Sequence, residues 1–198
     1  AVDDYLDNVI KKHENTREEK EQDRIRHVDT LSAQTGPIFL AYRSREEINR
    51  VVETVMVKEA PLYDFTAADG ISHTVWKIAD ADKVQQIRDT FASIDDIYIA
   101  DGHHRAASAV KVGLKRRKEH PGYDGTEEFN YFLSVLFPDD QLMIMDYNRV
   151  VRDLNGLSAE EFLKRTNEIF TVTELGQKAK HPEKKGQFTM YLEGKWYL

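Results

Sequence analysis

Hydrophobic and polar residues follow one another along the chain in patterns that predict a mixture of helices and strands. Short runs rich in β-branched and aromatic residues predict strands, whereas apolar residues spaced three and four apart predict helices with one buried face. The predicted strands are 37–42, 62–66, 71–78, 97–100, 131–137, 142–151, 171–175 and 188–198. The predicted helices are 2–31, 45–57, 80–94, a helix opening at 106–110, and 158–169. The expected fold is therefore α+β, with a mixed sheet, flanking helices and a long charged helix in front.

The same pattern contains no internal repeat and predicts one division of the chain. Asn155 and Gly156 form a turn signal between two groups of elements, which places a boundary between residues 1–155 and a smaller α+β segment at 156–198. The chain starts at Ala1 and stops inside a predicted strand, so we expect it to be part of a longer protein.

The predicted helix over 2–31 carries its basic residues and histidines at regular intervals. They are His13, Arg17, Lys20, Arg24 and His27, and their spacing of 4, 3, 4 and 3 places all five on one helix face. A highly charged helix is usually just solvated. The alternative is a cationic face that borders an anion site, in which Glu14 is a carboxylate suited to act as a base or as a metal ligand.

Composition narrows the range of functions. The chain has 28 basic and 35 acidic residues among 198, a formal charge of −7, and this is a poor match for the phosphate backbone of a duplex. Without cysteine there are neither disulfides nor thiolate metal sites, which suits a cytoplasmic location. No apolar run reaches the roughly 20 residues that a membrane span needs. We therefore expect no sequence-specific nucleic-acid partner and no membrane partner.

The sequence Asp101-Gly102-His103-His104-Arg105, the signature turn, lies between a predicted buried strand and a predicted helix. Unpaired N–H groups and the helix dipole attract anions at such a turn, and imidazole and guanidinium groups add donors for phosphate oxygens. Asp101 is suited to cap the helix, hold a metal or accept a proton. In the simpler alternative Asp101 is only a cap and both histidines are surface residues. The pattern favours a phosphate site.

The stretch 99–109 around this turn resembles the signature of the ParB/sulfiredoxin-like superfamily in its free-serine-kinase branch. It is most similar to a widespread prokaryotic family of unknown function related to those kinases. Weaker similarity covers 11–17, 36–40, and Asp69-Gly70 with His73 and Trp76. Sulfiredoxins have a catalytic cysteine where this chain has His103, so thiol-based repair is excluded. ParB proteins have a Glu-Arg-Arg pattern at 103–105, so the kinase branch fits best.

The resemblance implies a ParB/sulfiredoxin-like core that binds nucleotide phosphates at the turn. The predicted function is transfer of a phosphoryl group from ATP or ADP to a small hydroxylated metabolite such as serine, with magnesium as a candidate cofactor. The alternative is a nucleotide-sensing module without catalysis. The candidate catalytic residues are Asp101, His103, His104 and Glu14. The candidate phosphate-binding residues are Gly102, His104, Arg105, Ala106, His13, Arg17, Lys20 and His73.

No metal-binding set of side chains is predicted. His103 and His104 are adjacent, so on a helix their rings diverge by about 100° and do not easily share an ion. A magnesium ion held mainly by nucleotide phosphates, with one carboxylate such as Asp101, is chemically simpler.

Overall fold

The computed structural model describes residues 1–198 and has the predicted α+β architecture, with a mixed sheet. The chain forms two compact units, residues 1–143 and residues 144–198. None of the helices combines the length and the apolar character that a membrane span requires.

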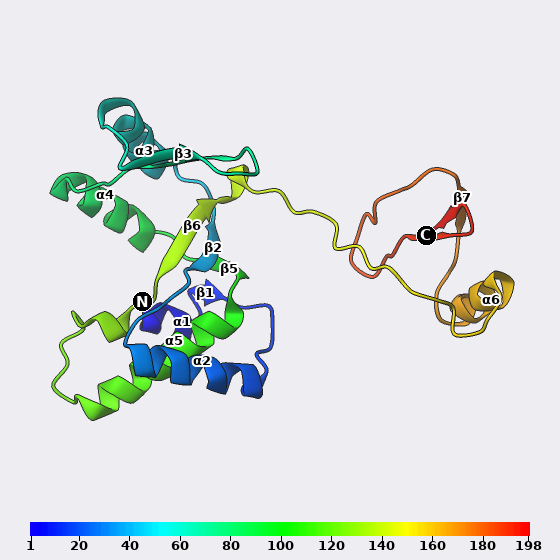
Figure 1. The fold of residues 1–198 in the computed structure, drawn as a ribbon, viewed down its shortest axis with the longest axis horizontal. Coiled ribbons are helices and arrows are strands. Elements are labelled where there is room, and N and C mark those ends of the chain that lie inside the picture. Colours follow the sequence, from blue (N-terminus) through cyan, green and yellow to red (C-terminus); the bar gives the residue numbers. More distant parts are fainter. The chain divides into compact units, whose positions relative to one another are not determined.

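The first unit is built on a four-stranded sheet in the order β1-β5-β2-β6 (Figure 1). Its strands are β1 (Ile10–Lys11), β5 (Ile97–Asp101), β2 (Ile38–Tyr42) and β6 (Ser134–Pro138). β1 runs parallel to β5, β5 antiparallel to β2, and β2 parallel to β6. The register is irregular between Phe39 and Leu40, next to the end of β5. The sheet is therefore mixed, as the sequence predicted.

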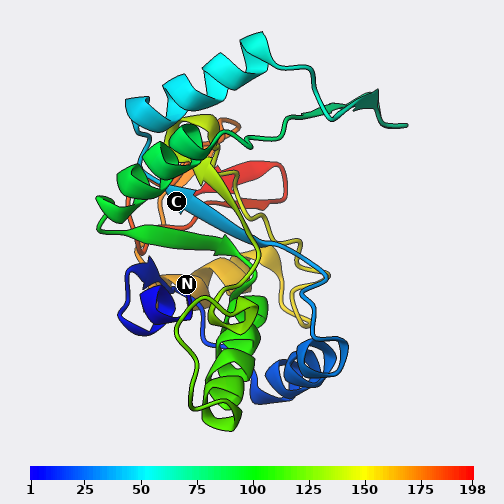
Figure 2. The same ribbon diagram turned by 90° about the vertical axis from the view of Figure 1, so that its left-hand side faces the viewer.

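Helices lie toward both ends of this sheet (Figures 1 and 2). They are α1 (Val2–Leu6), α2 (Glu18–Leu31) and α5 (His103–Glu119) at one end, and α3 (Glu46–Lys58) and α4 (Ala81–Ala92) at the other. Alternate residues of β2 are buried, and they contribute to two apolar clusters. One contains Ile10, Ile38, Leu40, Ile99 and Ala106, and the other Tyr42, Ile48 and Ile94. In the first cluster Ala106 packs α5, the helix that follows the signature turn, against the sheet.

The predicted helix over 2–31 is wrong as a continuous element. α1 ends at Leu6, Asn8 has a left-handed φ of 60°, and α2 begins only at Glu18. Between them Ile10 pairs with Ile97 in the sheet and is 3% exposed. Burial of an apolar side chain of this size contributes about 1.5–3 kcal/mol, more than the few tenths that helix propensity contributes per residue. Sheet pairing therefore overrides the local helical pattern.

Residues 63–75 form the predicted hairpin, whose second strand is shorter than the predicted 71–78, and the strands that follow differ in part from prediction. β3 (Tyr63–Thr66) pairs antiparallel with β4 (Ser72–Val75), and Gly70 adopts a φ of 82° in the turn. Two short 3-10 helices, η1 (Glu128–Asn130) and η2 (Asp139–Gln141), flank β6, so the predicted strand at 131–137 starts later. The predicted strand at 142–151 is wrong: no strand pairs with this segment, and an isolated strand leaves its backbone groups without partners.

The second unit contains α6 (Ala159–Ile169) and a three-stranded antiparallel sheet. Its strands are β7 (Glu174–Gly176), β8 (Met190–Leu192) and β9 (Lys195–Tyr197), in the order β7-β9-β8. The Ser158 hydroxyl accepts a hydrogen bond from the Glu161 N–H at 3.2 Å, which confirms the predicted helix start. The predicted strand at 188–198 is divided by a turn at Gly194, whose φ is 83°.

Candidate functional site

The signature turn joins β5 directly to α5. Gly102 is the N-cap of α5 and has a φ of 99°, a backbone conformation that side chains other than glycine rarely adopt. A Cβ at this position would also lie 3.1 Å from Nε of Arg105. No side chain caps this 17-residue helix, so its first N–H groups are not taken up by a capping side chain. An uncapped helix N-terminus is suited to bind an anion.

Asp101 does not cap the helix, contrary to one predicted role. It is the last residue of β5, and its carboxylate accepts a hydrogen bond from Nη2 of Arg105 at 2.7 Å. Nη1 of the same guanidinium donates to the carbonyl oxygen of Pro37. Arg105 therefore ties the end of β5 to the segment that enters β2, and its orientation is set by two oxygen partners.

Both signature imidazoles contact the loop at residues 12–17, between β1 and α2. The N–H of Arg17 donates to Nε2 of His104 at 3.1 Å, and the N–H of His13 points at Nε2 of His103 at 3.4 Å. The rings of His13 and His103 meet edge to face, with centroids 4.4 Å apart. The sequence predicted these imidazoles as donors to phosphate, whereas in the structure each Nε2 accepts a backbone N–H. Their first role is to hold the 12–17 loop against the turn.

His103 is 4% exposed and lies next to the Glu14 carboxylate. Its Nδ1 atom is 3.4 Å from Oε2 of Glu14. Burial lowers the pKa of His103, and the nearby His13 lowers it further, whereas Glu14 and Asp101 oppose the shift. The lowered pKa favours the neutral imidazole, in which Nε2 accepts from the loop and Nδ1 carries the hydrogen beside the Glu14 carboxylate.

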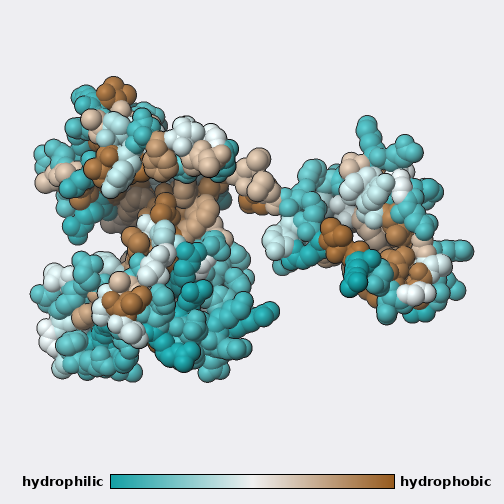
Figure 3. All heavy atoms as spheres, viewed as in Figure 1, coloured by the Kyte–Doolittle hydropathy of each residue, from teal (hydrophilic) through white to brown (hydrophobic).

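A cavity of about 740 Å³, the turn cavity, opens between the signature turn and the first half of α2. It is lined by Glu14, Glu19, Lys20, Asp23, Arg24 and Arg26, and by residues 101–105. Hydrophilic residues dominate the surface over α2 and α5 in this view (Figure 3). Lys20 and Arg24 form no ion pair in the structure, unlike Arg26, which pairs with Asp23 at 3.5 Å. The turn cavity therefore has two cations available to an anion, with carboxylates beside them.

The structure brings most predicted site residues together. Asp101, His103, His104, Glu14, Gly102, Arg105 and Lys20 line the turn cavity. His13 contacts His103 from the 12–17 loop rather than from a helix, and Arg17 contributes its backbone N–H. Because the predicted helix is broken, His13 lies outside α2. It therefore does not share one helix face with Lys20, Arg24 and His27 as predicted.

Besides His13 and Arg17, two predicted residues do not line the turn cavity, Ala106 and His73. Ala106 is fully buried in the core, and its N–H donates to the carbonyl of Gly102 within the helix, so it is not available to a phosphate. His73 stacks on Phe65 in the β3–β4 hairpin, with centroids 5.2 Å apart. The sequence analysis did not assign Glu19, Asp23 and Arg26 to the site. They lie four and three residues apart on α2, and this spacing places them on one helix face.

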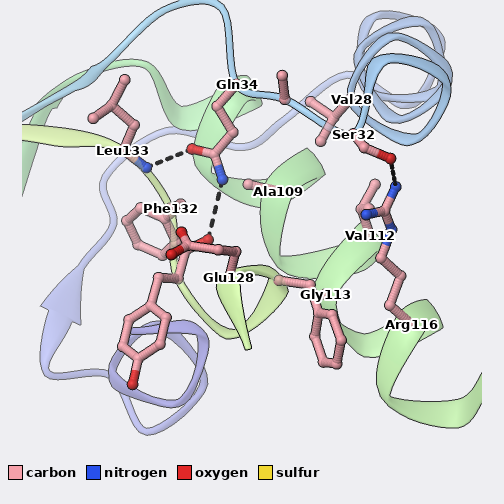
Figure 4. A pocket seen from close by; sticks show the side chains of 13 residues that line it. Val28, Ser32, Gln34, Ala109, Val112, Gly113, Arg116, Glu128, Phe132 and Leu133 are labelled. Carbon is pink, nitrogen blue, oxygen red and sulfur yellow. Dashed lines mark hydrogen bonds between the residues drawn. The ribbon is translucent and has the colours of Figure 1, made fainter. Parts of the chain in front are cut away.

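A separate cavity of about 460 Å³ lies between α2, α5 and the chain before β6 (Figure 4). The Gln34 side chain closes one side: its Nε2 donates to the Tyr131 carbonyl at 3.1 Å, and its Oε1 accepts from the Leu133 N–H. Arg116 donates to the Ser32 hydroxyl on another side. This cavity contains none of the signature residues. The structure also has no group of three or more His, Asp or Glu side chains arranged to hold a metal ion.

Fold and site together define an α+β protein with a four-stranded mixed sheet and an open helix N-terminus facing a charged cavity. The chain belongs to the family described as "Protein of unknown function (DUF1015)", whose model matches residues 1–198. This match confirms the predicted membership of a family of unknown function. Neither the curated proteins nor the solved structures contain a match to this chain.

Proposed function

We propose that this protein binds a nucleotide through its phosphates at the signature turn and transfers a phosphoryl group to a small hydroxylated metabolite. The observation that carries this proposal is the uncapped N-terminus of α5, which faces a cavity containing two cations without ion pairs, Lys20 and Arg24. Phosphoryl transfer depends mainly on positioning and charge neutralisation. Backbone N–H groups would position the phosphates, and the two cations would neutralise their charge.

The carboxylates of the turn cavity suit the remaining requirements of this chemistry. Glu14 lies beside His103 and is the candidate to accept the proton of the acceptor hydroxyl. Carboxylate oxygens are also ligands that magnesium prefers. Asp101 is the residue that would help to hold a magnesium ion, which would neutralise phosphate charge when bound. The resemblance of residues 99–109 to the free-serine-kinase branch supports ATP or ADP as the nucleotide and serine or a relative as the acceptor.

A nucleotide-sensing module without catalysis is the second candidate. It is favoured by the use of both signature imidazoles to hold the 12–17 loop, since such a loop can respond to phosphates at the turn without any reaction. The ParB-like side of the resemblance points the same way. The two candidates share the phosphate site and differ only in turnover.

One experiment separates them. The full-length protein is incubated with ATP or ADP, magnesium and a panel of amino and hydroxy acids, and phosphorylated products are followed by phosphorus NMR. A new phosphomonoester supports the phosphotransferase. Nucleotide binding without product over the whole panel supports the sensing module, and absence of nucleotide binding overturns both.

The Arg105→Ala variant tests where the phosphates bind. A charge-assisted hydrogen bond contributes about 1.5–3 kcal/mol, so we expect nucleotide affinity to fall at least about tenfold in calorimetry. Arg165→Ala is the matched control, because Arg165 also forms an i,i+4 ion pair of 2.7 Å, with Glu161 on α6. Lys20→Ala is the second variant, since Lys20 has no ion pair whose loss would disturb the fold. Equal affinities in all four proteins would refute the placement.

A further inference from the structure

The β3–β4 hairpin forms a two-stranded sheet of its own. Every residue of both strands is exposed, and none belongs to either apolar cluster of the first unit. In Figure 2 the hairpin extends away from the four-stranded sheet. An isolated two-stranded hairpin is only marginally stable in water, and packing of an apolar face stabilises it. The composition of its two faces therefore shows whether it has such a face to pack.

The two faces of the hairpin differ in character. Side chains alternate between the faces of a strand, and cross-strand partners such as Phe65 and His73 share a face. One face, the hairpin face, is formed by the odd-numbered residues Tyr63, Phe65, Ile71, His73 and Val75. On the other, polar face Oγ1 of Thr74 donates to the Asp64 carboxylate at 3.1 Å, and the Thr66 and Ser72 hydroxyls are 3.2 Å apart. The polar face is therefore suited to solvent, and the hairpin face is suited to a partner.

The hairpin face is apolar and open to solvent. The exposed fractions of its apolar side chains are 61% for Tyr63, 55% for Phe65, 56% for Ile71 and 45% for Val75. His73 stacks on Phe65 within the face. The two carboxylates of the hairpin lie elsewhere, that of Asp64 on the polar face and that of Asp69 in the turn. Contiguous exposed apolar side chains, free of carboxylates, lysines and arginines, mark an interaction surface.

We infer that the hairpin face packs against the hairpin face of a second copy of this chain, with a two-fold axis between them. A two-fold contact places identical side chains near one another, which suits an apolar face, whereas a charged face would repel its own copy. At about 150–250 Å² for a buried aromatic side chain, the exposed fractions give roughly 300–400 Å² per copy. The dimer then buries roughly 600–800 Å², below the about 1,200 Å² of stable complexes, so it is weak and concentration-dependent. The inference is independent of the proposed function, since no hairpin residue lines the turn cavity.

Sedimentation of the full chain from low to high micromolar concentration tests the dimer, and we expect the average mass to rise toward twice that of the monomer. Phe65→Asp places a carboxylate against its symmetry mate, so we expect association to weaken at least about tenfold. Phe188→Asp is the matched control. Both rings are exposed and each contacts one aromatic neighbour, at 5.2 Å for Phe65 and 5.9 Å for Phe188. A chain that stays monomeric at every concentration overturns the inference, as does equal weakening by both variants.

Cross-linking locates the contact without adding a charge to the hairpin face. The chain contains no cysteine, so an introduced thiol reacts alone. Ile71→Cys places a thiol on the hairpin face, and Val57→Cys places one on α3, where Val57 is 84% exposed. With a short bismaleimide, we expect Ile71→Cys to form covalent dimers at least several-fold faster than Val57→Cys. Equal rates overturn the inference, and this result stands even where Phe65→Asp fails to fold.

Discussion

At the scale of single residues, the two histidines of the signature turn hold the 12–17 loop, whereas the sequence predicted that they donate to phosphate. Each accepts a backbone N–H from the 12–17 loop through Nε2, and an imidazole does so only when that nitrogen is unprotonated. His103 is also buried, and burial lowers its pKa. The docking of the loop that carries Glu14 therefore depends on neutral imidazoles.

This arrangement predicts a loss of stability in mild acid. The unfolded chain protonates His103 near its ordinary pKa of about 6.5, whereas the folded protein protonates it only at lower pH. Between these values the unfolded state binds more protons, so the free energy of unfolding decreases as pH falls through this window and is fully restored above it. Urea denaturation at several pH values measures the decrease.

Two histidine variants separate this effect from other titrations. His103→Gln removes the titrating ring, and we expect a flatter dependence of stability on pH below about 6.5. His120→Gln is the control, because His120 is exposed and follows the end of α5. A pH dependence that is identical in both variants would contradict the assignment to His103.

At the scale of elements, α5 is held by acidic residues of α1 and α2. Glu21 pairs with Lys111, Asp29 with Lys115 and Arg116, and Asp3 with Arg117 through two bonds of 2.6 and 2.8 Å. Glu21 is 4% exposed, and Thr16 from the 12–17 loop donates to its carboxylate at 2.7 Å. The basic run at 111–118 is therefore mostly paired within the fold, and the same contacts place α2 beside the turn.

The packing of α5 against η1 supplies an element-scale prediction. Gly113 is a helical residue with ordinary φ, where alanine would by itself stabilise a helix by about 1 kcal/mol. A Cβ there would lie 2.5 Å from the carbonyl oxygen of Phe129, a backbone atom that has little freedom to move. Overpacking costs about 1–3 kcal/mol, so the clash outweighs the propensity.

We therefore expect Gly113→Ala to lower the free energy of unfolding by about 1–2 kcal/mol, measured by urea denaturation. Gly122→Ala is the control, because no atom lies within 4 Å of a Cβ at that position. A Gly113→Ala variant that is as stable as the unaltered protein would show that α5 and η1 are less tightly packed than the structure indicates.

At the scale of the whole molecule, charge argues against a nucleic-acid partner. The formal charge is −7, and four basic residues of the 111–118 run already pair with acidic residues. Phosphate contacts supply most of the affinity for a duplex and require an unpaired basic surface. We expect no sequence-dependent retardation of duplex DNA at physiological salt in an electrophoretic mobility assay. Tight, sequence-dependent retardation would favour a ParB-like role instead.

The sequence by itself determined the elements whose causes are local. The strand at 97–100, the Asp-Gly turn of the β3–β4 hairpin, the cap at Ser158 and the glycine at position 102 each depend on a few neighbouring residues. Hydrophobic spacing and turn chemistry depend on residues that are close in the sequence. The structure confirms these four predictions.

Only the tertiary structure decided what lies across from the signature turn. The break in the predicted 2–31 helix arises because Ile10 pairs with Ile97, and the contact between His13 and His103 joins residues 90 positions apart. His73, which the resemblance pointed to, stays in the β3–β4 hairpin. Helical spacing describes neighbours on one element, whereas pairing and burial between distant segments contribute larger free energies and override it. For that reason the strand–glycine–helix arrangement of the turn was predictable, whereas the contacts of its two histidines with the 12–17 loop were not.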